Sequence, residues 1–107
     1  MPDQKKSRRE MLEAFVAQKP NDPFSLYGLA MECMNSGDPG AADTHFRALV
    51  NNHADYIPAY LMYAQFLARE SRPADAREVL STGIAAADRK HDDHARSEME
   101  TLLNDLA

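Results

Sequence analysis

The sequence has no tryptophan, four glycines and a single cysteine among its 107 residues. One cysteine cannot form an internal disulfide, so the chain is compatible with a reducing cytosol. Glycine is a poor helix former, whereas the alanine and leucine that fill most of the apolar positions are strong ones. This composition favours an all-α protein.

Positive charge and long hydrophobic runs are also scarce. Lysine and arginine number 12 against 17 aspartates and glutamates, which gives a net charge of −5. Proteins that bind nucleic acid present a basic stripe, so we expect no nucleic acid partner. The longest apolar run, residues 57–68, is too short to span a bilayer, and no apolar stretch follows the charged N-terminus as in a signal peptide. We therefore expect a cytoplasmic protein without a membrane partner.

Catalytic and metal-binding patterns are weak. Cys33 falls on an apolar stripe, no serine or cysteine is placed beside a histidine as a nucleophile, and no glycine-rich phosphate loop follows a strand. We expect no enzyme activity and no cofactor. In HDDH at 91–94, His91 and His94 lie three residues apart and Glu98 lies one turn beyond His94, a spacing that metal ligands use. The alternative is a hydrophilic turn in which an aspartate caps the last helix, and we expect no metal site.

Six helical segments can be predicted. Ser7 and Glu10 form a capping box for the first, and Asp22 caps the second, with Pro23 at its first position. Short linkers should make neighbouring helices antiparallel. The segments cover residues 7–20, 22–35, 38–52, 56–70, 72–90 and 91–106.

Two stretches 34 residues apart share a pattern. GDPGAADTHF at 37–46 and SRPADAREVL at 71–80 both open a helix with proline, then place alanine four residues before a large apolar side chain. Aligning residues 23–56 with 57–90 brings further apolar positions together. Leu26, Leu29, Ala30 and Cys33 fall on Tyr60, Tyr63, Ala64 and Leu67, and Ala42, Phe46 and Leu49 fall on Ala76, Leu80 and Gly83. The alanines would let the two helices of a hairpin approach closely, and copies of the hairpin would stack.

This period and pattern resemble the tetratricopeptide repeat, a 34-residue helical hairpin. The resemblance implies a right-handed stack of antiparallel helical hairpins in one domain, residues 1–107. The repeats would be 23–56 and 57–90, with capping helices at 7–20 and 91–106. Within the first segment, Leu12, Phe15 and Pro20 stand in register with the second helix of a preceding repeat.

In this family the first helices of successive repeats line a concave groove, which the resemblance implies here. The residues expected to line it are Phe24, Tyr27, Met31, Met34, Leu61, Gln65, Ala68 and Arg69. Gly28, Met31 and Met62 stand where the family's carboxylate-clamp members need polar groups, which argues against a chaperone tail as ligand. We expect a non-catalytic scaffold that presents an apolar groove to a peptide or helix of a protein partner. The alternative is that the same face is a homodimer interface, or that a terminal helix of the chain covers it.

Overall fold

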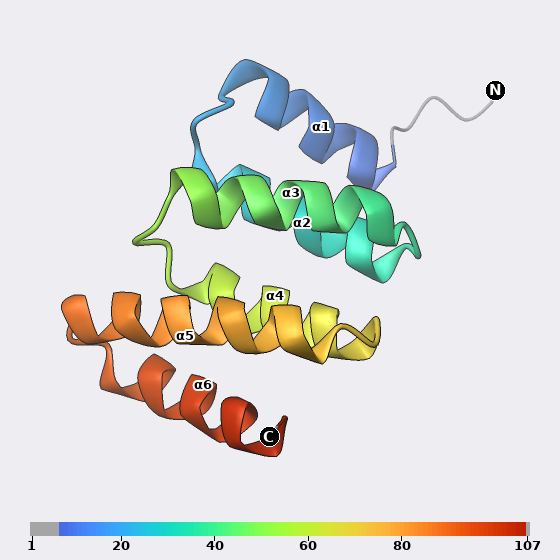
Figure 1. Ribbon diagram of the computed structural model, residues 1–107. Coiled ribbons are helices and arrows are strands. Elements are labelled where there is room, and N and C mark those ends of the chain that lie inside the picture. Colours follow the sequence, from blue (N-terminus) through green and yellow to red (C-terminus); the bar gives the residue numbers. More distant parts are fainter. Residues whose placement is uncertain (1–6, 107) are drawn as a thin grey trace, which may run out of the picture. The chain divides into compact units, whose positions relative to one another are not determined.

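The computed structural model describes residues 7–106, and within that range the chain forms six helices and no strand (Figure 1). This confirms the predicted all-α fold and its six helical segments. The helices are α1 (Arg8–Gln18), α2 (Pro23–Asn35), α3 (Pro39–Asn52), α4 (Pro58–Arg69), α5 (Pro73–Arg89) and α6 (Asp93–Asp105). None of them is long and apolar enough to cross a membrane.

The predicted caps begin the helices. The Ser7 hydroxyl accepts a hydrogen bond from the Glu10 backbone N–H, and the Glu10 side chain accepts one from the Ser7 N–H. Asp22 accepts from Phe24 N at 3.2 Å, and Asp38 accepts from Ala41 N at 3.2 Å. Each cap satisfies N–H groups that the first helical turn leaves unpaired. Local sequence therefore decides where these helices start.

Three residues end helices with positive φ angles. Gly37, after α2, has φ 82°, as the sequence predicts, because glycine adopts this conformation without steric cost. Ser71, after α4, and His91, after α5, have φ 63° and 57° although both carry a Cβ atom. The turns after α4 and α5 thus keep the positive φ angle of the turn after α2, although they have no glycine at that position.

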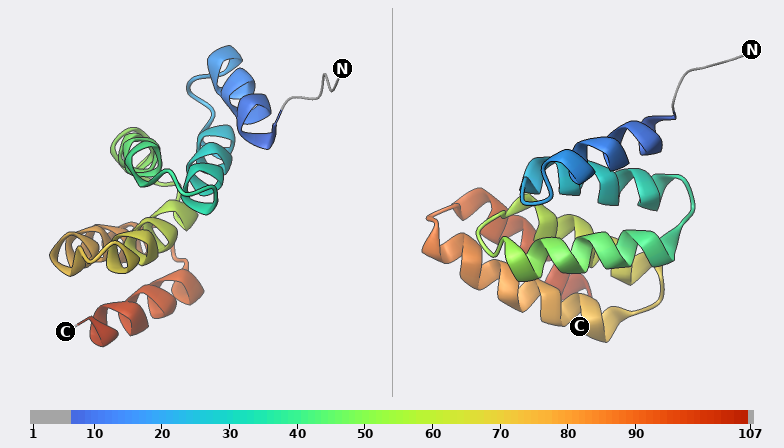
Figure 2. Two further views of the ribbon diagram at one scale, coloured as in Figure 1. Left: turned by 90° about the vertical axis from the view of Figure 1, so that its right-hand side faces the viewer. Right: turned by 90° about the horizontal axis from the view of Figure 1, so that it is seen from above.

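The chain divides into two compact units, residues 1–49 and 50–107. In the first, α1 packs against α2, and α3 follows α2 after a three-residue turn. In the second, α5 packs against both α4 and α6, and α4 also contacts α6 (Figures 1 and 2).

The three helices of the second unit meet at Gly83. A Cβ atom added to this residue would lie 2.5 Å from Tyr60 Cβ on α4 and 2.7 Å from Met99 Sδ on α6. These distances are too short for any real side-chain carbon, so the missing side chain is what lets the three helices come together.

The positions that the 34-residue alignment pairs are all buried. This holds for Leu26, Leu29, Ala30, Cys33, Ala42, Phe46 and Leu49 and for their counterparts Tyr60, Tyr63, Ala64, Leu67, Ala76, Leu80 and Gly83. Ala30, Ala42, Ala64 and Ala76 have no accessible surface. Alanine at these positions permits close helix packing, as the 34-residue pattern predicts.

Candidate binding site

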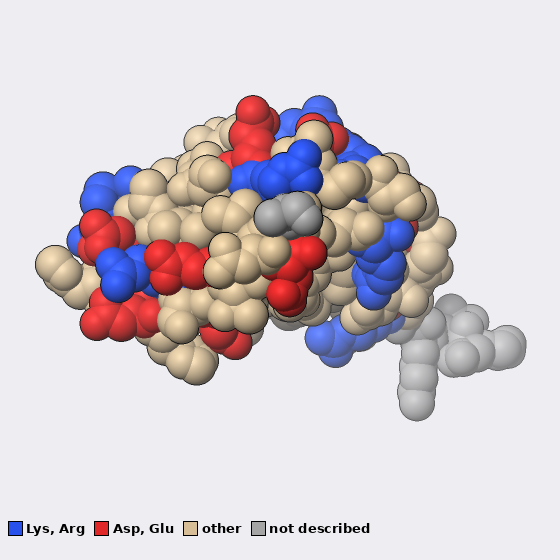
Figure 3. Space-filling model, turned by 60° about the horizontal axis from the view of Figure 1, so that its bottom comes forward, with Lys and Arg blue, Asp and Glu red and all other residues tan. Residues whose placement is uncertain are grey.

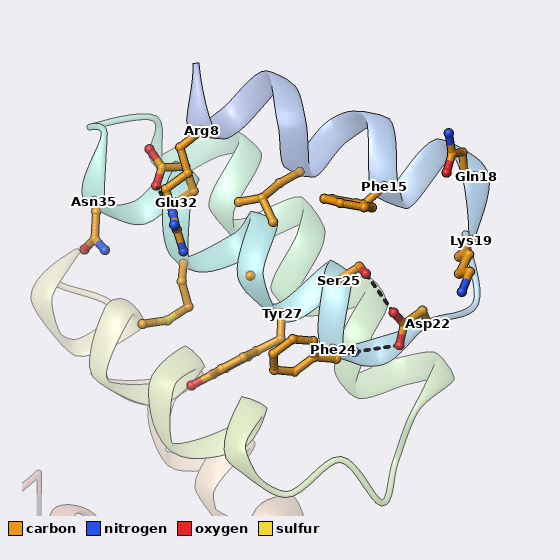
Figure 4. A pocket seen from close by; sticks show the side chains of 13 residues that line it. Arg8, Phe15, Gln18, Lys19, Asp22, Phe24, Ser25, Tyr27, Glu32 and Asn35 are labelled. Carbon is orange, nitrogen blue, oxygen red and sulfur yellow. Dashed lines mark hydrogen bonds and ion pairs between the residues drawn. The ribbon is translucent and has the colours of Figure 1, made fainter. Parts of the chain in front are cut away.

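A hollow of about 780 Å³ lies between α1 and α2 in the first unit (Figure 4). We call it the α1–α2 hollow. Its lining residues are Arg8, Leu12, Phe15, Gln18, Lys19, Asp22, Phe24, Ser25, Tyr27, Gly28, Met31, Glu32 and Asn35. Both helices contribute to it, so α1 is a wall of the hollow.

The middle of the hollow is apolar and open to solvent. Phe24 is 72% exposed and Phe15 54%, values uncommon for phenylalanine in a folded protein. Gly28 adds no side chain to the floor, and Leu12 lies so close to it that a Cβ there would be 3.2 Å from Leu12 Cδ2. The helix α1 therefore packs against α2 over part of its surface and leaves an apolar face uncovered.

The polar residues stand at the two ends of the hollow. At one end Arg8 Nε lies 3.2 Å from Glu32 Oε1. At the other, the Ser25 hydroxyl donates to Asp22 Oδ2 at 2.7 Å, and this hydrogen bond lowers the pKa of Asp22 (Figure 4). Lys19, the C-cap of α1, also stands at this end. A ligand would thus meet an apolar centre between two charged ends.

Arg9 holds α1 to the turn between α2 and α3. Its Nη1 donates to Asp38 Oδ2 at 2.8 Å and its Nε to Glu13 Oε2 at 3.2 Å. The hydrogen bond from Arg9 lowers the pKa of Asp38, which also caps α3. The wall of the hollow is therefore attached to the helical hairpin behind it by a charge-assisted hydrogen bond as well as by apolar packing.

The predicted groove residues are divided between the two units. Phe24, Tyr27 and Met31 line the α1–α2 hollow, while Met34 is half-buried and does not. In the second unit, Leu61 and Gln65 line a hollow of about 370 Å³ between α4 and α6. Ala68 and Arg69 do not line that hollow.

Sequence reasoning missed the contribution of α1 to the α1–α2 hollow. The repeat register marks Leu12 and Phe15 only as core positions of a preceding repeat. Their alignment with Phe46 and Leu49 was the available signal, because residues 7–106 contain no helix before α1 that could cover these positions. An apolar stripe that is core inside a repeat becomes surface at its end.

The other candidate residues with reactive or metal-binding side chains are Cys33, His45 and those of the HDDH turn. Cys33 has no accessible surface, and burial raises the pKa of its thiol, which disfavours the reactive thiolate. Burial lowers the pKa of His45 and so favours its neutral form. In the HDDH turn Asp92 accepts from Ala95 N and caps α6, as predicted, and His94 Nε2 lies 3.3 Å from Glu98 Oε1. Among residues 7–106 no three histidine, cysteine or acidic side chains are grouped as metal ligands.

Surface charge gives no sign of a nucleic acid site on the face drawn in Figure 3. Basic and acidic side chains lie next to one another there, and neither sign makes a broad patch. In the second unit several charges are paired, as in Arg96 with Asp88 at 2.8 Å and Arg89 with Asp55 at 3.2 Å. Exposed pairs of this kind contribute little stability.

The fold is that of a helical repeat protein, and solved structures identify which kind. No protein-family model and no curated protein matches this sequence. The solution structure of a tetratricopeptide repeat domain protein from Salinibacter ruber is 27% identical with a TM-score of 0.78, over 82% of this chain and 89% of that one. A protein from Bordetella parapertussis is 25% identical with a TM-score of 0.79, over 95% of this chain and 89% of that one.

The type III secretion translocator chaperone SycD of Yersinia enterocolitica is similar in fold alone. It is 13% identical with a TM-score of 0.81, over 92% of this chain and 68% of that one. Together these neighbours confirm the resemblance inferred from the 34-residue pattern: the chain has the tetratricopeptide repeat fold. They indicate a protein-interaction scaffold, since this fold generally serves binding rather than catalysis.

Proposed function

We propose that this protein is a non-catalytic, cytoplasmic scaffold that binds a peptide or helix of another protein in the α1–α2 hollow. The observation that carries the proposal is the solvent-exposed apolar centre of the hollow, with Phe15 and Phe24 more than half exposed. Exposed apolar surface bounded by polar residues is typical of protein interaction sites. Tyr27 and Met31 add an aromatic and a flexible apolar side chain, which suit an adaptable recognition surface.

One protein of similar fold, SycD, is a type III secretion translocator chaperone. Leu61, Gln65, Ala68 and Arg69 remain predicted contributors from the second unit. Of these, Leu61 and Gln65 face a hollow whose other lining residues are largely polar. We therefore place the main contact in the first unit.

Photo-cross-linking in the source cell tests the proposal. Phe24→p-benzoylphenylalanine keeps an aromatic side chain at the most exposed apolar position of the hollow, and the same substitution at Glu78, exposed on α5, is the control. We expect position 24 to form a cross-link to another protein, whose sequence differs from that of this chain. Position 78 should form none. Cross-links to this chain alone would support a homodimer instead, and equal yields from both positions would contradict the proposal.

The substitution Met31→Glu is a second test of the proposed function. Met31 is half-buried and lines the open hollow, so the free protein should stay folded with this substitution. A ligand would bury the new carboxylate without a counter-charge, which costs several kcal/mol, so the cross-link should disappear. Loss of the fold would mean that the chain itself covers the α1–α2 hollow. Conversion of a dimer to a monomer in light scattering would mean that it is a self-interface.

A further inference from the structure

The six helices alternate between two kinds. The helices α1, α3 and α5 are second helices of the 34-residue hairpin, and α2, α4 and α6 are first helices. Two positions in the core pattern recur on the second helices. The first is occupied by Leu12, Phe46 and Leu80, and the second by Phe15, Leu49 and Gly83. All are buried on α3 and α5, whereas on α1 Leu12 is half-buried and Phe15 is 54% exposed. The helix α1 therefore exposes positions that its two counterparts bury.

The second unit shows what covers these positions on α5. There α4, a first helix, contacts both the second helix that follows it, α5, and the next first helix, α6. Tyr60 of α4 reaches Gly83 of α5 beside Met99 of α6. By the alternation, α1 and α2 correspond to α5 and α6. No helix precedes α1 within residues 7–106, so the α1–α2 hollow corresponds to the place that α4 fills in the second unit.

We propose that the α1–α2 hollow is the seat of an amphipathic helix of another protein, which completes a helical repeat in trans. This inference rests on the proposed function and specifies the form of its ligand. Within the second unit α5 runs antiparallel to both α4 and α6 (Figure 1), so α4 and α6 run in the same direction. The bound helix accordingly runs parallel to α2 and antiparallel to α1. Its length is set by α1, whose 11 residues span about 16 Å, or three turns.

Charge fixes which end of the ligand helix is acidic. In the second unit, Asp55 precedes α4 and lies 3.2 Å from Arg89 and 4.0 Å from Lys90, the C-cap of α5. Lys19 is the C-cap of α1 and has no ion pair within 4 Å in the described part of the chain. The ligand should therefore carry an acidic residue just before its helix, where an acidic group also favours the helix dipole.

Side-chain size fixes the centre of the ligand. Gly83 makes room for Tyr60 of α4, but the corresponding residue of α1 is Phe15. Two aromatic rings cannot share the space that one ring and a glycine fill. The ligand helix should therefore have a small residue, alanine or glycine, where α4 has Tyr60.

The probe is a synthetic blocked peptide with the sequence of residues 55–69 of this chain, which contains Asp55 and the whole of α4, made with Tyr60 or with Y60A. We expect the Y60A peptide to bind the full-length protein more tightly than the tyrosine version and to become helical in circular dichroism on binding. Met31→Glu should abolish binding. Lys19→Glu should weaken it about two- to fivefold, as exposed pairs do, and a peptide with D55K should restore it.

The orientation of the bound peptide is measured by attaching a nitroxide spin label to its N-terminus and recording the amide NMR signals of the protein. The label should broaden the signals of Lys19 and Asp22 and spare those of Arg8 and Asn35. Broadening at Arg8, tighter binding of the tyrosine peptide, or a bound peptide that is not helical would each overturn the inference. So would broadening around Lys90, because the peptide would then have displaced α4 from its own place.

Failure of this inference can be told from failure of the proposed function. Cross-links from position 24 to another protein, with no binding of either peptide, would leave the hollow as an interaction site but refute the helix seat. Self-association that M31E abolishes would refute both, since a second copy would then fill the hollow.

Discussion

Replacing Gly83 by alanine tests the packing of the second unit at its tightest point. The new Cβ is fixed to the α5 backbone and would lie 2.5 Å from Tyr60 Cβ, itself next to the backbone of α4. Neither atom can turn away, so the helices must separate, and overpacking of this kind costs about 3 kcal/mol at the upper end of the usual range. Alanine regains about 1 kcal/mol of helix propensity relative to glycine. The net loss should be about 2 kcal/mol, or roughly 8–16 °C in melting temperature.

Urea denaturation followed by circular dichroism measures this loss, and Gly40→Ala is the matched control. Gly40 lies in the first turn of α3, where an added Cβ would meet nothing closer than Asp38 Oδ1 at 4.0 Å. Its replacement should leave stability unchanged or raise it by up to about 1 kcal/mol. A G83A protein as stable as the parent chain would show that α4 and α5 do not approach as closely as described.

Other substitutions test the repeat, its turns and its charges. Ala76→Leu should cost about 1–3 kcal/mol in the same assay, because this side chain has no accessible surface; a neutral result would contradict the hairpin alignment. Ser71→Gly should add up to about 1 kcal/mol by removing the steric cost of φ 63°, and a loss of stability would contradict that cost. Replacing His91 and His94 together by asparagine should leave the melting temperature unchanged, whereas stoichiometric zinc binding lost in this double variant would establish a metal site. The hydrogen bond from Arg9 on α1 lowers the pKa of Asp38 in the folded protein. This bond therefore contributes its full stability above the unfolded pKa of about 3.9, and the contribution is lost as the pH falls through the lowered native pKa. Carbon NMR titration of this carboxyl group should give a midpoint below about 3.9, and a midpoint at or above it would contradict the bond.

The helices could be predicted because their signals are local. Ser7, Asp22 and Asp38 begin helices through hydrogen bonds to N–H groups two or three residues later, so the residues involved are close together in the sequence. The burial of the repeat positions could also be predicted, since a 34-residue period in apolar residues is visible without a structure. Both kinds of signal survive in a single sequence because they need no knowledge of which helices pack together.

Features that depend on several helices could not be predicted. Gly83 aligns with Leu49 and looks like the loss of an apolar side chain, but it is the point where Tyr60 and Met99 meet α5. The positive φ of Ser71 has no glycine to announce it. In the same way, Phe15 has a core pattern and a surface position. Within the units of the described chain, α1 packs against α2, whereas α5 packs against both α4 and α6.

The first and last helices of the described chain differ, and this difference is why we propose a binding site beside α1. The helix α6 turns polar residues to solvent, as a capping helix of a repeat array does: Ser97, Glu98 and Thr101 are exposed and line the hollow it forms with α4. The first unit carries Met11, Phe15 and Phe24, the large apolar residues that are most exposed among residues 7–106. A repeat without a polar cover keeps the apolar surface that stacking would otherwise bury. The repeat pattern that stabilises the interior thus leaves an exposed apolar surface on α1 and α2, where we propose that one more helix binds.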